Sequence, residues 1–282
     1  MFDANNPEKI FTVKKSVREG DPLVLIDFLE KYTGLSKSTL KKVLNNGGVW
    51  LRKFNNQKRV RVRRATTEIN SESHIEFFYD PKVINAPVVD AREIFHHKNF
   101  GVWYKPQGLL SQGTEYGDHC SILRQVEKKY PKVFLVHRLD REAHGLMVFA
   151  YDHKIAAELQ VQWEKNFVKK YYKVEVLGNI QKRYPKGGEV TSKLDGKPAH
   201  TTFEILEQKE DSAVLRVQIH TGRLHQIRRH MEEIGFPVMG DPKYGRGNKN
   251  AEGLKLLAYE LSFNDPHTRK EMSFKLGDDV AF

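Results

Sequence analysis

The order of strand-like and helix-like segments constrains the fold of this chain most strongly. After about residue 93, segments typical of strands, such as "FGVWYK" and "VLRVQIH", mix with helical segments such as "SILRQVEKKY", which stops at Pro131. The two kinds do not alternate regularly enough for a doubly wound sheet. We therefore predict an α+β domain over residues 86–282, with a mixed, mostly antiparallel sheet. The segment Asp80–Glu93 carries two prolines and little periodicity, and we interpret it as a linker.

Residues 1–85 are predicted to form a separate small α/β module with two helices and some strands. "DPLVLIDFLEKYTG" offers Asp21 as an N-cap and Pro22 at the first helical position. "SKSTLKKVLNNGG" places Leu40, Val43 and Leu44 on one helix face and ends in Asn-Gly-Gly. Both helices are therefore expected to pack one apolar face against the rest of the module.

Positive charge is concentrated in this module. The chain has a net charge of +11, and residues 1–85 hold 16 Lys and Arg against 10 Asp and Glu. "KRVRVRR", read as a strand, would bury Val60 and Val62 on one face and present arginines on the other. A solvated basic surface is one interpretation, but a nucleic-acid platform is the better one. The predicted contacts are Lys41, Lys42, Arg59, Arg61 and Arg63.

The remaining composition points to an intracellular protein. No apolar run is long enough to span a bilayer, and the N-terminal residues lack the apolar core of a signal peptide. Cys120 is the single cysteine, so no intrachain disulfide can form. We expect a cytoplasmic protein with no membrane partner.

The stretch "VHRLDREAHGLMVFA" places an acid among basic residues at the entrance of an apolar run. Asp140 follows His137 and Arg138 and precedes Arg141. The stretch could be an ordinary turn. It could also hold an ionised carboxylate that acts as a nucleophile, because neighbouring cations favour the charged form of an acid.

A second segment, "IHTGRLHQIRRHMEEIGFPVMGDPKYG", predicts a helix from about Arg223 to Ile234. Arg228 lies about 40° from Leu224 on the helical wheel, whereas Arg229 lies about 140° away. Arg228 is therefore expected to face the interior, where it needs an anionic partner, and Asp140 is a candidate. His225 and His230 do not share a face, so a metal site there is not expected. The apolar stripe consists of Leu224, Ile227, Met231 and Ile234.

A third segment, "FVKKYYKVEVLG", alternates like a strand. Lys170 and Tyr172 then share one face with Val174 and Val176. A core tyrosine with a satisfied hydroxyl would explain this pattern. A lysine and a tyrosine on an inward face are also compatible with a site.

Taken together, these three motifs, with "KPQGLL" and "GKPAHTTFEIL", resemble the RluA-type pseudouridine synthases across nearly all of residues 93–282. The resemblance implies an active-site cleft in which Asp140 is the catalytic aspartate, Tyr172 the active-site tyrosine and Arg228 the arginine that pairs with the aspartate. Arg138 matches the arginine that helps to open the RNA, and we count Arg223 with the RNA-binding residues. The N-terminal module resembles an S4-type RNA-binding domain over about residues 18–79.

One departure from the family concerns the residues after Asp140. Where the family has Thr-Ser-Gly, this chain has Ala143, His144 and Gly145. Two hydroxyls that could support the aspartate loop are thus absent from the sequence.

The implied reaction converts uridine to pseudouridine in a stem-loop of ribosomal or transfer RNA, and we expect a monomer that needs no cofactor or metal. The N1–C1′ bond breaks, the uracil rotates, and C5 joins C1′. A carboxylate can attack the sugar or the base, or stabilise charge at C1′. The residues leave two other classes open, namely an inactive RNA-binding protein with the same fold and a different acid-dependent enzyme. The latter usually needs several carboxylates or a metal cluster.

Overall fold

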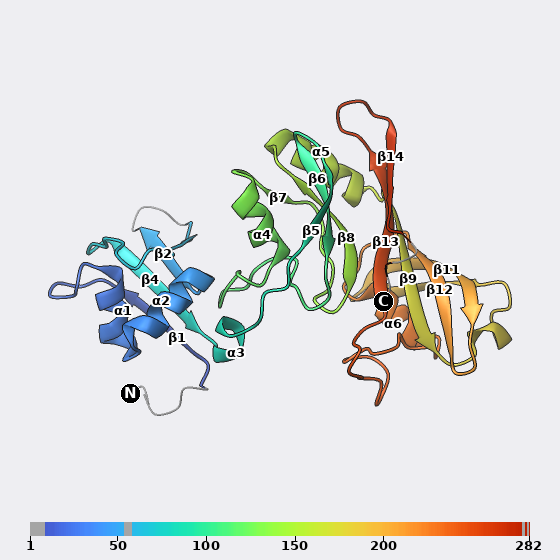
Figure 1. The fold of residues 1–282 in the computed structure, drawn as a ribbon, viewed down its shortest axis with the longest axis horizontal. Coiled ribbons are helices and arrows are strands. Elements are labelled where there is room, and N and C mark those ends of the chain that lie inside the picture. Colours follow the sequence, from blue (N-terminus) through green and yellow to red (C-terminus); the bar gives the residue numbers. More distant parts are fainter. Residues whose placement is uncertain (1–8, 54–57, 278–279, 281) are drawn as a thin grey trace. The chain divides into compact units, whose positions relative to one another are not determined.

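The computed structural model describes residues 9–53, 58–277, 280 and 282. The chain divides into two compact units, shown with the rest of the chain in Figure 1. The first unit comprises Met1–Val89 with Gln112–Gln125, and the second comprises Asp90–Ser111 with Val126–Phe282. The first eight residues of the predicted N-terminal module lie outside the described residues.

The first unit pairs two longer helices and one short helix with a four-stranded antiparallel sheet. The strands follow the order β1-β4-β2-β3. The helices bury Phe28 and Leu40 among sheet residues such as Phe77, which makes one apolar core. The elements are β1 (Phe11–Ser16), α1 (Leu25–Thr33), α2 (Lys37–Asn46), β2 (Val49–Lys53), β3 (Val60–Arg61), β4 (Ser73–Tyr79) and α3 (Pro81–Ile84).

Helix α2 confirms the prediction from sequence, whereas the start of α1 does not. The side chain of Ser36 caps α2 by accepting from the backbone N–H of Thr39, and Gly47 ends the helix in the left-handed region. Helix α1 begins only at Leu25, because Val24 pairs with Glu68 as extended chain. The prediction of Asp21 as N-cap and Pro22 as first helical residue was therefore wrong.

Two further local predictions need correction. Strand β3 contains only Val60 and Arg61, and Val60 is 50% exposed rather than buried, although Val62 is buried as predicted. Only two residue pairs join β3 to β2. The observed strand is therefore much shorter than the predicted one, and it does not bury one complete face. The supposed linker contains helix α3, which the side chain of Asp80 caps, and its last residues open the next strand.

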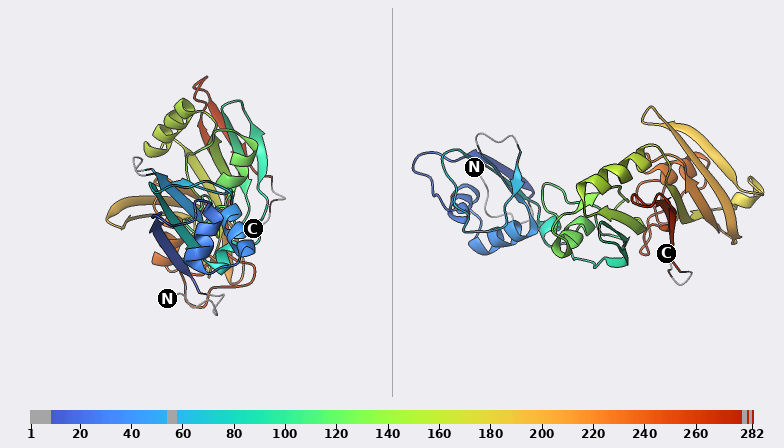
Figure 2. Two further views of the ribbon diagram at one scale, coloured as in Figure 1. Left: turned by 90° about the vertical axis from the view of Figure 1, so that its left-hand side faces the viewer. Right: turned by 90° about the horizontal axis from the view of Figure 1, so that it is seen from above.

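The second unit is built on a ten-stranded mixed sheet, which confirms the α+β prediction. Eight strands follow the order β10-β11-β12-β9-β13-β8-β6-β5, while β14 pairs with β13 and β7 pairs with β8. Figure 2 shows β10–β12 in yellow and orange. The strands are β5 (Arg92–His96), β6 (Phe100–Lys105), β7 (Phe134–Leu135), β8 (His144–Ala150), β9 (Lys169–Leu177), β10 (Gly188–Leu194), β11 (Lys197–Gln208), β12 (Ser212–Ile219), β13 (Leu256–Asn264) and β14 (Glu271–Lys275).

The helices of this part of the chain are short and lie between strands in the sequence. No helix among the described residues is both long and apolar enough to cross a membrane. They are α4 (Ile122–Lys129), α5 (His153–Glu164), the 3₁₀ turn η1 (Ile180–Lys182) and α6 (Gln226–Glu233).

The pairing of β8 with β13 is the one parallel pairing among the described strands, and it sits directly after the Asp140 loop. Gly145 pairs with Ala258 and has a φ of 122°. A Cβ atom at this position would overlap the carbonyl oxygen of Ala258. Glycine is therefore required for β13 to approach the start of β8, and this approach fixes where the preceding loop ends.

Helix α6 begins three residues later than predicted. His225, just before it, has a φ of 53°, a left-handed conformation that cannot continue into a helix. Ile227 and Met231 are buried as expected, but Leu224 is 59% exposed. The prediction of Leu224 as part of the buried stripe was wrong, because this residue lies outside the helix.

Candidate active site

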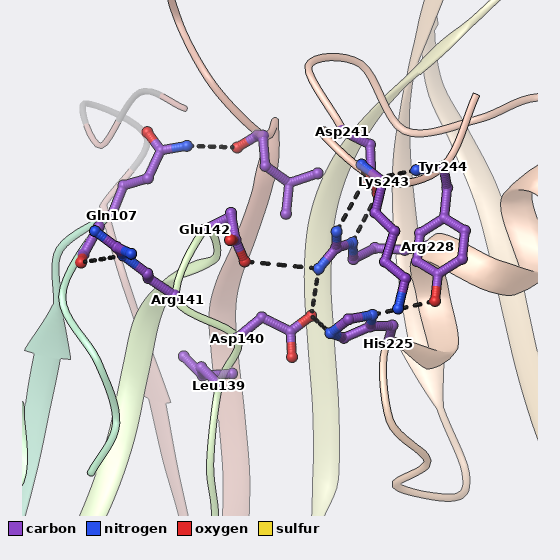
Figure 3. Close-up of polar contacts among 12 residues, drawn as sticks. Gln107, Leu139, Asp140, Arg141, Glu142, His225, Arg228, Asp241, Lys243 and Tyr244 are labelled. Atoms are coloured by element: carbon purple, nitrogen blue, oxygen red, sulfur yellow. Dashed lines mark hydrogen bonds and ion pairs between the residues drawn. The ribbon is translucent and has the colours of Figure 1, made fainter. Parts of the chain in front are cut away.

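Arg228 donates hydrogen bonds to two carboxylates in the interior of the second unit, and a third carboxylate, that of Glu142, lies 3.7 Å from its Nη1. The side chain of Arg228 is only 2% exposed. Nε and Nη2 donate to the carboxylate of Asp241 at 2.7 and 2.8 Å, and Nη1 donates to Oδ2 of Asp140 at 3.1 Å (Figure 3). Burial alone would lower the pKa of Arg228, but the hydrogen bonds and charges of Asp241 and then Asp140 raise it. The guanidinium therefore stays cationic beside Asp140.

The contact between Arg228 and Asp140 agrees with the prediction from the helical wheel, which placed Arg228 toward the interior with Asp140 as a candidate partner. Arg229, on the opposite side of α6, makes hydrogen bonds to the exposed side chain of Asp195 instead. The neighbouring arginines of one helix thus have different environments, one buried and one at the surface.

The backbone before Asp140 is held by a hydroxyl. Ser111 Oγ accepts from the N–H of Leu139 at 2.9 Å and donates to the carbonyl of the same residue at 2.6 Å. Ser111 thus holds both backbone polar groups of Leu139, so the backbone that leads into Asp140 cannot rotate without breaking these hydrogen bonds.

Lys105 holds the other side of the loop from within the core. Its side chain is fully buried, and Nζ donates to the carbonyls of Pro106, Leu109 and Arg141 at 3.1, 2.8 and 3.4 Å. Three carbonyls match the three donors of an ammonium group. Burial lowers the pKa of Lys105 to about 7, against the opposing charge of Asp140. Lys105 thereby ties the "KPQGLL" segment to the residue that follows Asp140.

Ala143 and His144 fill the positions where the resemblance would place two hydroxyls. Both residues are 2% exposed. Ala143 packs in the core with α6, and the ring of His144 lies edge-on to Tyr104 with centroids 6.4 Å apart. In this chain these positions contribute packing, while Ser111 supplies a hydroxyl contact to the loop.

Tyr172 lies on the predicted face of β9, close enough to Asp140 to sense its charge. Burial first, and then the charge of Asp140, raise the pKa of Tyr172 above its ordinary value. The phenol therefore remains protonated at neutral pH. Lys170, on the same face, is buried, and burial lowers its pKa to about 8.

His225 completes the polar surroundings of Asp140. Its Nε2 lies 3.8 Å from Oδ2 of Asp140, and its Nδ1 is 3.1 Å from the hydroxyl of Tyr244 (Figure 3). The ring of Tyr244 in turn lies over the guanidinium of Arg228, 5.3 Å from its carbon. Burial lowers the pKa of His225, although the charge of Asp140 opposes this shift. The neutral imidazole is thus favoured beside the carboxylate.

The predicted RNA-binding residues of the second unit lie near this site in the chain but differ in their contacts. Arg138 is exposed in the Asp140 loop. Arg223 donates from Nε to the carbonyl of Pro198 at 3.0 Å, so part of its guanidinium is already bound. Among the residues that the structure describes, no group of three or more His, Cys, Asp or Glu side chains could hold a metal ion.

In the first unit, the predicted arginines are paired with acids. Arg59 contacts Glu76 at 2.7 Å and Glu115 at 2.6 Å. Arg61 and Arg63 both form ion pairs with Asp118. Their positive charge is thus largely offset within the unit. Lys41 and Lys42 on α2 are exposed, and Lys42 donates to the amide oxygen of Asn85.

Several residues of the site were not assigned roles from the sequence, namely Asp241, Lys105, Ser111 and His225. Asp241 lies in the quoted segment "GDPKYG" and Lys105 in "KPQGLL". A signal was available for both, because an aspartate and a lysine within apolar surroundings each need a partner. Ser111 carried no such signal, since serine is common in turns.

Comparison with known proteins gives a consistent result. Residues 99–233 match the RNA pseudouridylate synthase family. The dual-specificity RNA pseudouridine synthase RluA of Vibrio parahaemolyticus is 34% identical over 185 residues, covering 57% of this chain and 73% of that protein. The ribosomal large subunit pseudouridine synthase D of Nitrosomonas europaea is 30% identical over 253 residues, covering 79% and 69%. The solved structure of human RNA pseudouridylate synthase domain containing 1 shares the fold, with a TM-score of 0.57, 19% identity and coverage of 67% and 84%.

Proposed function

This chain belongs to the RluA-type RNA pseudouridine synthases, which isomerise uridine in RNA, and we propose that Asp140 is the carboxylate on which the reaction depends. The isomerisation breaks the N1–C1′ bond and forms a C5–C1′ bond within one nucleotide. The C5 hydrogen leaves as a proton and N1 gains one, so atoms and charge balance without an added reactant. A carboxylate can take part as a nucleophile or by stabilising positive charge at C1′.

The buried bridge of Arg228 between Asp140 and Asp241 carries this proposal. The bidentate contact to Asp241 fixes the guanidinium, so Nη1 is presented to Asp140 with little freedom. Asp140 remains 22% exposed, so a substrate atom can reach it. Arg228 is a positioning residue in this scheme, because it acts on the substrate through Asp140.

We assign Tyr172 to the base or ribose of the target uridine. Its raised pKa keeps the phenol as a hydrogen-bond donor and apolar surface beside Asp140. The neutral His225 and the hydroxyl of Tyr244 would limit the movement of the carboxylate on its other side. The target base must leave its stack to reach these groups, and this costs least in a loop or bulge.

For the substrate, we propose large-subunit ribosomal RNA. The similarity to a ribosomal large subunit synthase, which extends over 79% of this chain, supports it. A transfer RNA target is the alternative. The first unit would act as an S4-like RNA-binding domain of a monomeric, cytoplasmic enzyme. Its net positive charge and the exposed Lys41 and Lys42 support an RNA contact.

The decisive experiment combines site mapping with the variant Asp140→Asn. Pseudouridines are mapped in total RNA from cells with the gene, without it, and complemented with the variant. We expect one or more uridines to lose modification without the gene, and the variant to fail to restore them although it folds and binds RNA, because an amide of the same shape carries no negative charge. Turnover within about tenfold of wild type would remove Asp140 from this role.

A further inference from the structure

The isomerisation needs a base, because the C5 hydrogen of the target uridine leaves as a proton. Tyr172 is a poor acceptor, since burial and the charge of Asp140 raise the pKa of its phenol and keep it protonated. Asp140 itself accepts a hydrogen bond from the buried Arg228 and is assigned to the reaction at C1′. The base is therefore to be found among the other groups that surround Asp140.

His225 presents a ring nitrogen to the carboxylate of Asp140 without a hydrogen bond to it. Nε2 lies 3.8 Å from Oδ2 of Asp140, and the side chain of His225 is 18% exposed, so a substrate atom can reach it (Figure 3). When C5 has joined C1′, it lies one covalent bond from the sugar carbon on which Asp140 acts. The hydrogen on C5 then comes close to the same region of the site as Nε2 of His225.

Contacts of the ring and of the backbone hold the imidazole of His225 in place. Nδ1 lies 3.1 Å from the hydroxyl of Tyr244, and the two rings meet edge-on with centroids 5.7 Å apart. The backbone of His225 has a φ of 53°. The side chain of the next residue, Gln226, accepts from the N–H of Arg223 and donates to the carbonyl of His200. When Nδ1–H donates to Tyr244, the lone pair of Nε2 is free to accept a proton.

The charges around the ring suit a group that is neutral before the reaction and protonated for a short time during it. Burial has the largest influence and lowers the pKa of His225, and the charges of Arg228 and Lys243 act in the same direction. The charges of Asp140 and Glu142 act in the opposite direction. The imidazole is thus neutral at neutral pH, and two carboxylates stabilise the imidazolium once it has formed.

We propose that His225 is the base that removes the C5 proton of the target nucleotide. This inference rests on the proposed role of Asp140. After the C5–C1′ bond has formed, C5 still carries its hydrogen and the ring contains an N1=C6 double bond. Nε2 takes the hydrogen as a proton, the C5–H electron pair becomes the C5=C6 bond, and the N1=C6 pair moves to N1. N1 then takes a proton from the imidazolium or from water, so the histidine becomes neutral again and no charge is left over.

The test measures single-turnover formation of pseudouridine in the mapped RNA, made with hydrogen or with deuterium at uracil C5 of the target. His225→Asn removes the base but keeps a residue that tolerates the left-handed backbone. We expect its rate to fall about a hundredfold, and the ratio of the hydrogen rate to the deuterium rate to exceed that of wild type, because removal of the C5 hydrogen becomes limiting. A residue that only positions Asp140 would slow the reaction without raising this ratio. An unchanged ratio, or a rate within about twofold of wild type, would overturn the proposal.

Two further variants serve as controls. His267 is exposed in the turn between β13 and β14, and His267→Asn should leave both the rate and the isotope ratio unchanged. Glu142 is the rival base, because its carboxylate lies 3.7 Å from Nη1 of Arg228. If Glu142→Gln raised the isotope ratio and His225→Asn did not, the base would be Glu142 and the proposal for His225 would be wrong.

A target with 5-fluorouridine separates this proposal from the role of Asp140. Fluorine cannot leave C5 as a proton, so the joining of C5 to C1′ can be followed by mass spectrometry without the base step. We expect His225→Asn to join C5 to C1′ within about threefold of the wild-type rate on this RNA, whereas Asp140→Asn should fail on both RNAs. If Asp140→Asn kept turnover, the role of Asp140 would be wrong, while the isotope ratio of His225→Asn would still report on the base.

Addition of imidazole gives an independent test that does not depend on the folding of His225→Asn. Glycine also accepts the left-handed backbone, and His225→Gly leaves space where the ring was. Imidazole in the buffer should restore turnover to His225→Gly, and the restored rate should rise with pH as the added imidazole becomes neutral. No restoration, or equal restoration by a neutral molecule of the same size that is not basic, would contradict the assignment.

Discussion

Helices α2 and α6 have similar local patterns but present their basic residues in opposite ways. In α2, Leu40, Val43 and Leu44 are buried, and Lys41 projects into solvent. In α6, Ile227 and Met231 are buried, and Arg228 is buried with them.

The difference lies in what faces each helix. Helix α6 faces the carboxylates of Asp140 and Asp241, whereas α2 packs its stripe against the apolar core of its own unit. Burying a cation is costly unless an anion compensates it, so the same residue type can be a buried positioning group or a surface charge. The position of a basic residue on a helical wheel is meaningful only together with its partners.

The largest effect on activity should come from replacing Arg228 of α6 with methionine, with the same replacement of Arg229 as the comparison. Arg228→Met should lower kcat by about a thousandfold, because it removes the donor to Asp140 and leaves Asp241 buried without its partner. Arg229→Met should change kcat less than about twofold, since Arg229 contacts only an exposed acid. Single-turnover kinetics and the melting temperature of both variants would check this. Equal effects would show that the buried and exposed positions are not functionally different.

A second change addresses the fixed end of the bridge. Asp241→Asn keeps the shape but removes the buried anion, so Arg228 would depend on Asp140 and on Glu142, whose carboxylate lies 3.7 Å from Nη1. We expect a loss of roughly 3 kcal/mol in unfolding free energy and a fall in kcat with little change in KM. Urea unfolding and steady-state kinetics measure the two effects. A variant as stable as wild type would mean that Asp140 and Glu142 compensate the buried cation without Asp241.

Whereas the structure keeps the buried Arg228 charged, it keeps the side chain of His137 uncharged. Its Nε2 accepts from the N–H of Val148 at 3.0 Å, and its ring stacks on Trp163. Burial, and then the charge of Lys170, lower its pKa to about 3. The unfolded chain binds a proton on His137 more readily than the folded chain does. The free energy of unfolding is therefore unaffected by the protonation of His137 above its unfolded pKa of about 6.5, and it decreases as the pH falls from there toward 3.

We therefore expect the unfolding free energy to fall by roughly 3 kcal/mol between pH 6.5 and pH 4 through His137, with a flatter slope in His137→Gln. Urea titrations of both proteins at several pH values measure this slope. Identical slopes would mean that His137 is not the titrating group.

The smallest effect concerns the surface charges of the first unit. Lys41→Ala with Lys42→Ala should reduce the slope of log affinity against log salt by roughly 0.7–0.9 for each phosphate that the protein no longer binds. Arg59→Gln should reduce it less, because Arg59 is already paired with Glu76 and Glu115. Filter-binding titrations with the same RNA at several salt concentrations check the comparison. A larger reduction for Arg59→Gln would mean that RNA displaces its acidic partners.

Much of the local structure and part of the site could be predicted from the sequence. The apolar spacing and the glycine at position 47 define α2, and the alternation in β9 places Tyr172 and Lys170 on one face. The helical phase separated Arg228 from Arg229. These properties follow from periodicity and from contacts between residues a few positions apart, which a single sequence displays directly.

The remaining features depend on residues that are distant in the chain. Asp241 meets Arg228 through the loop after α6, Lys105 and Ser111 hold the Asp140 loop from 28 or more positions away, and Asp118 pairs with the arginines near β3. A left-handed His225 also places Leu224 in water although its periodicity marks it as buried. The topology brings distant segments together. It therefore decides which residue pairs with a buried charge and which side chain is exposed at the end of a helix. No local pattern contains that information.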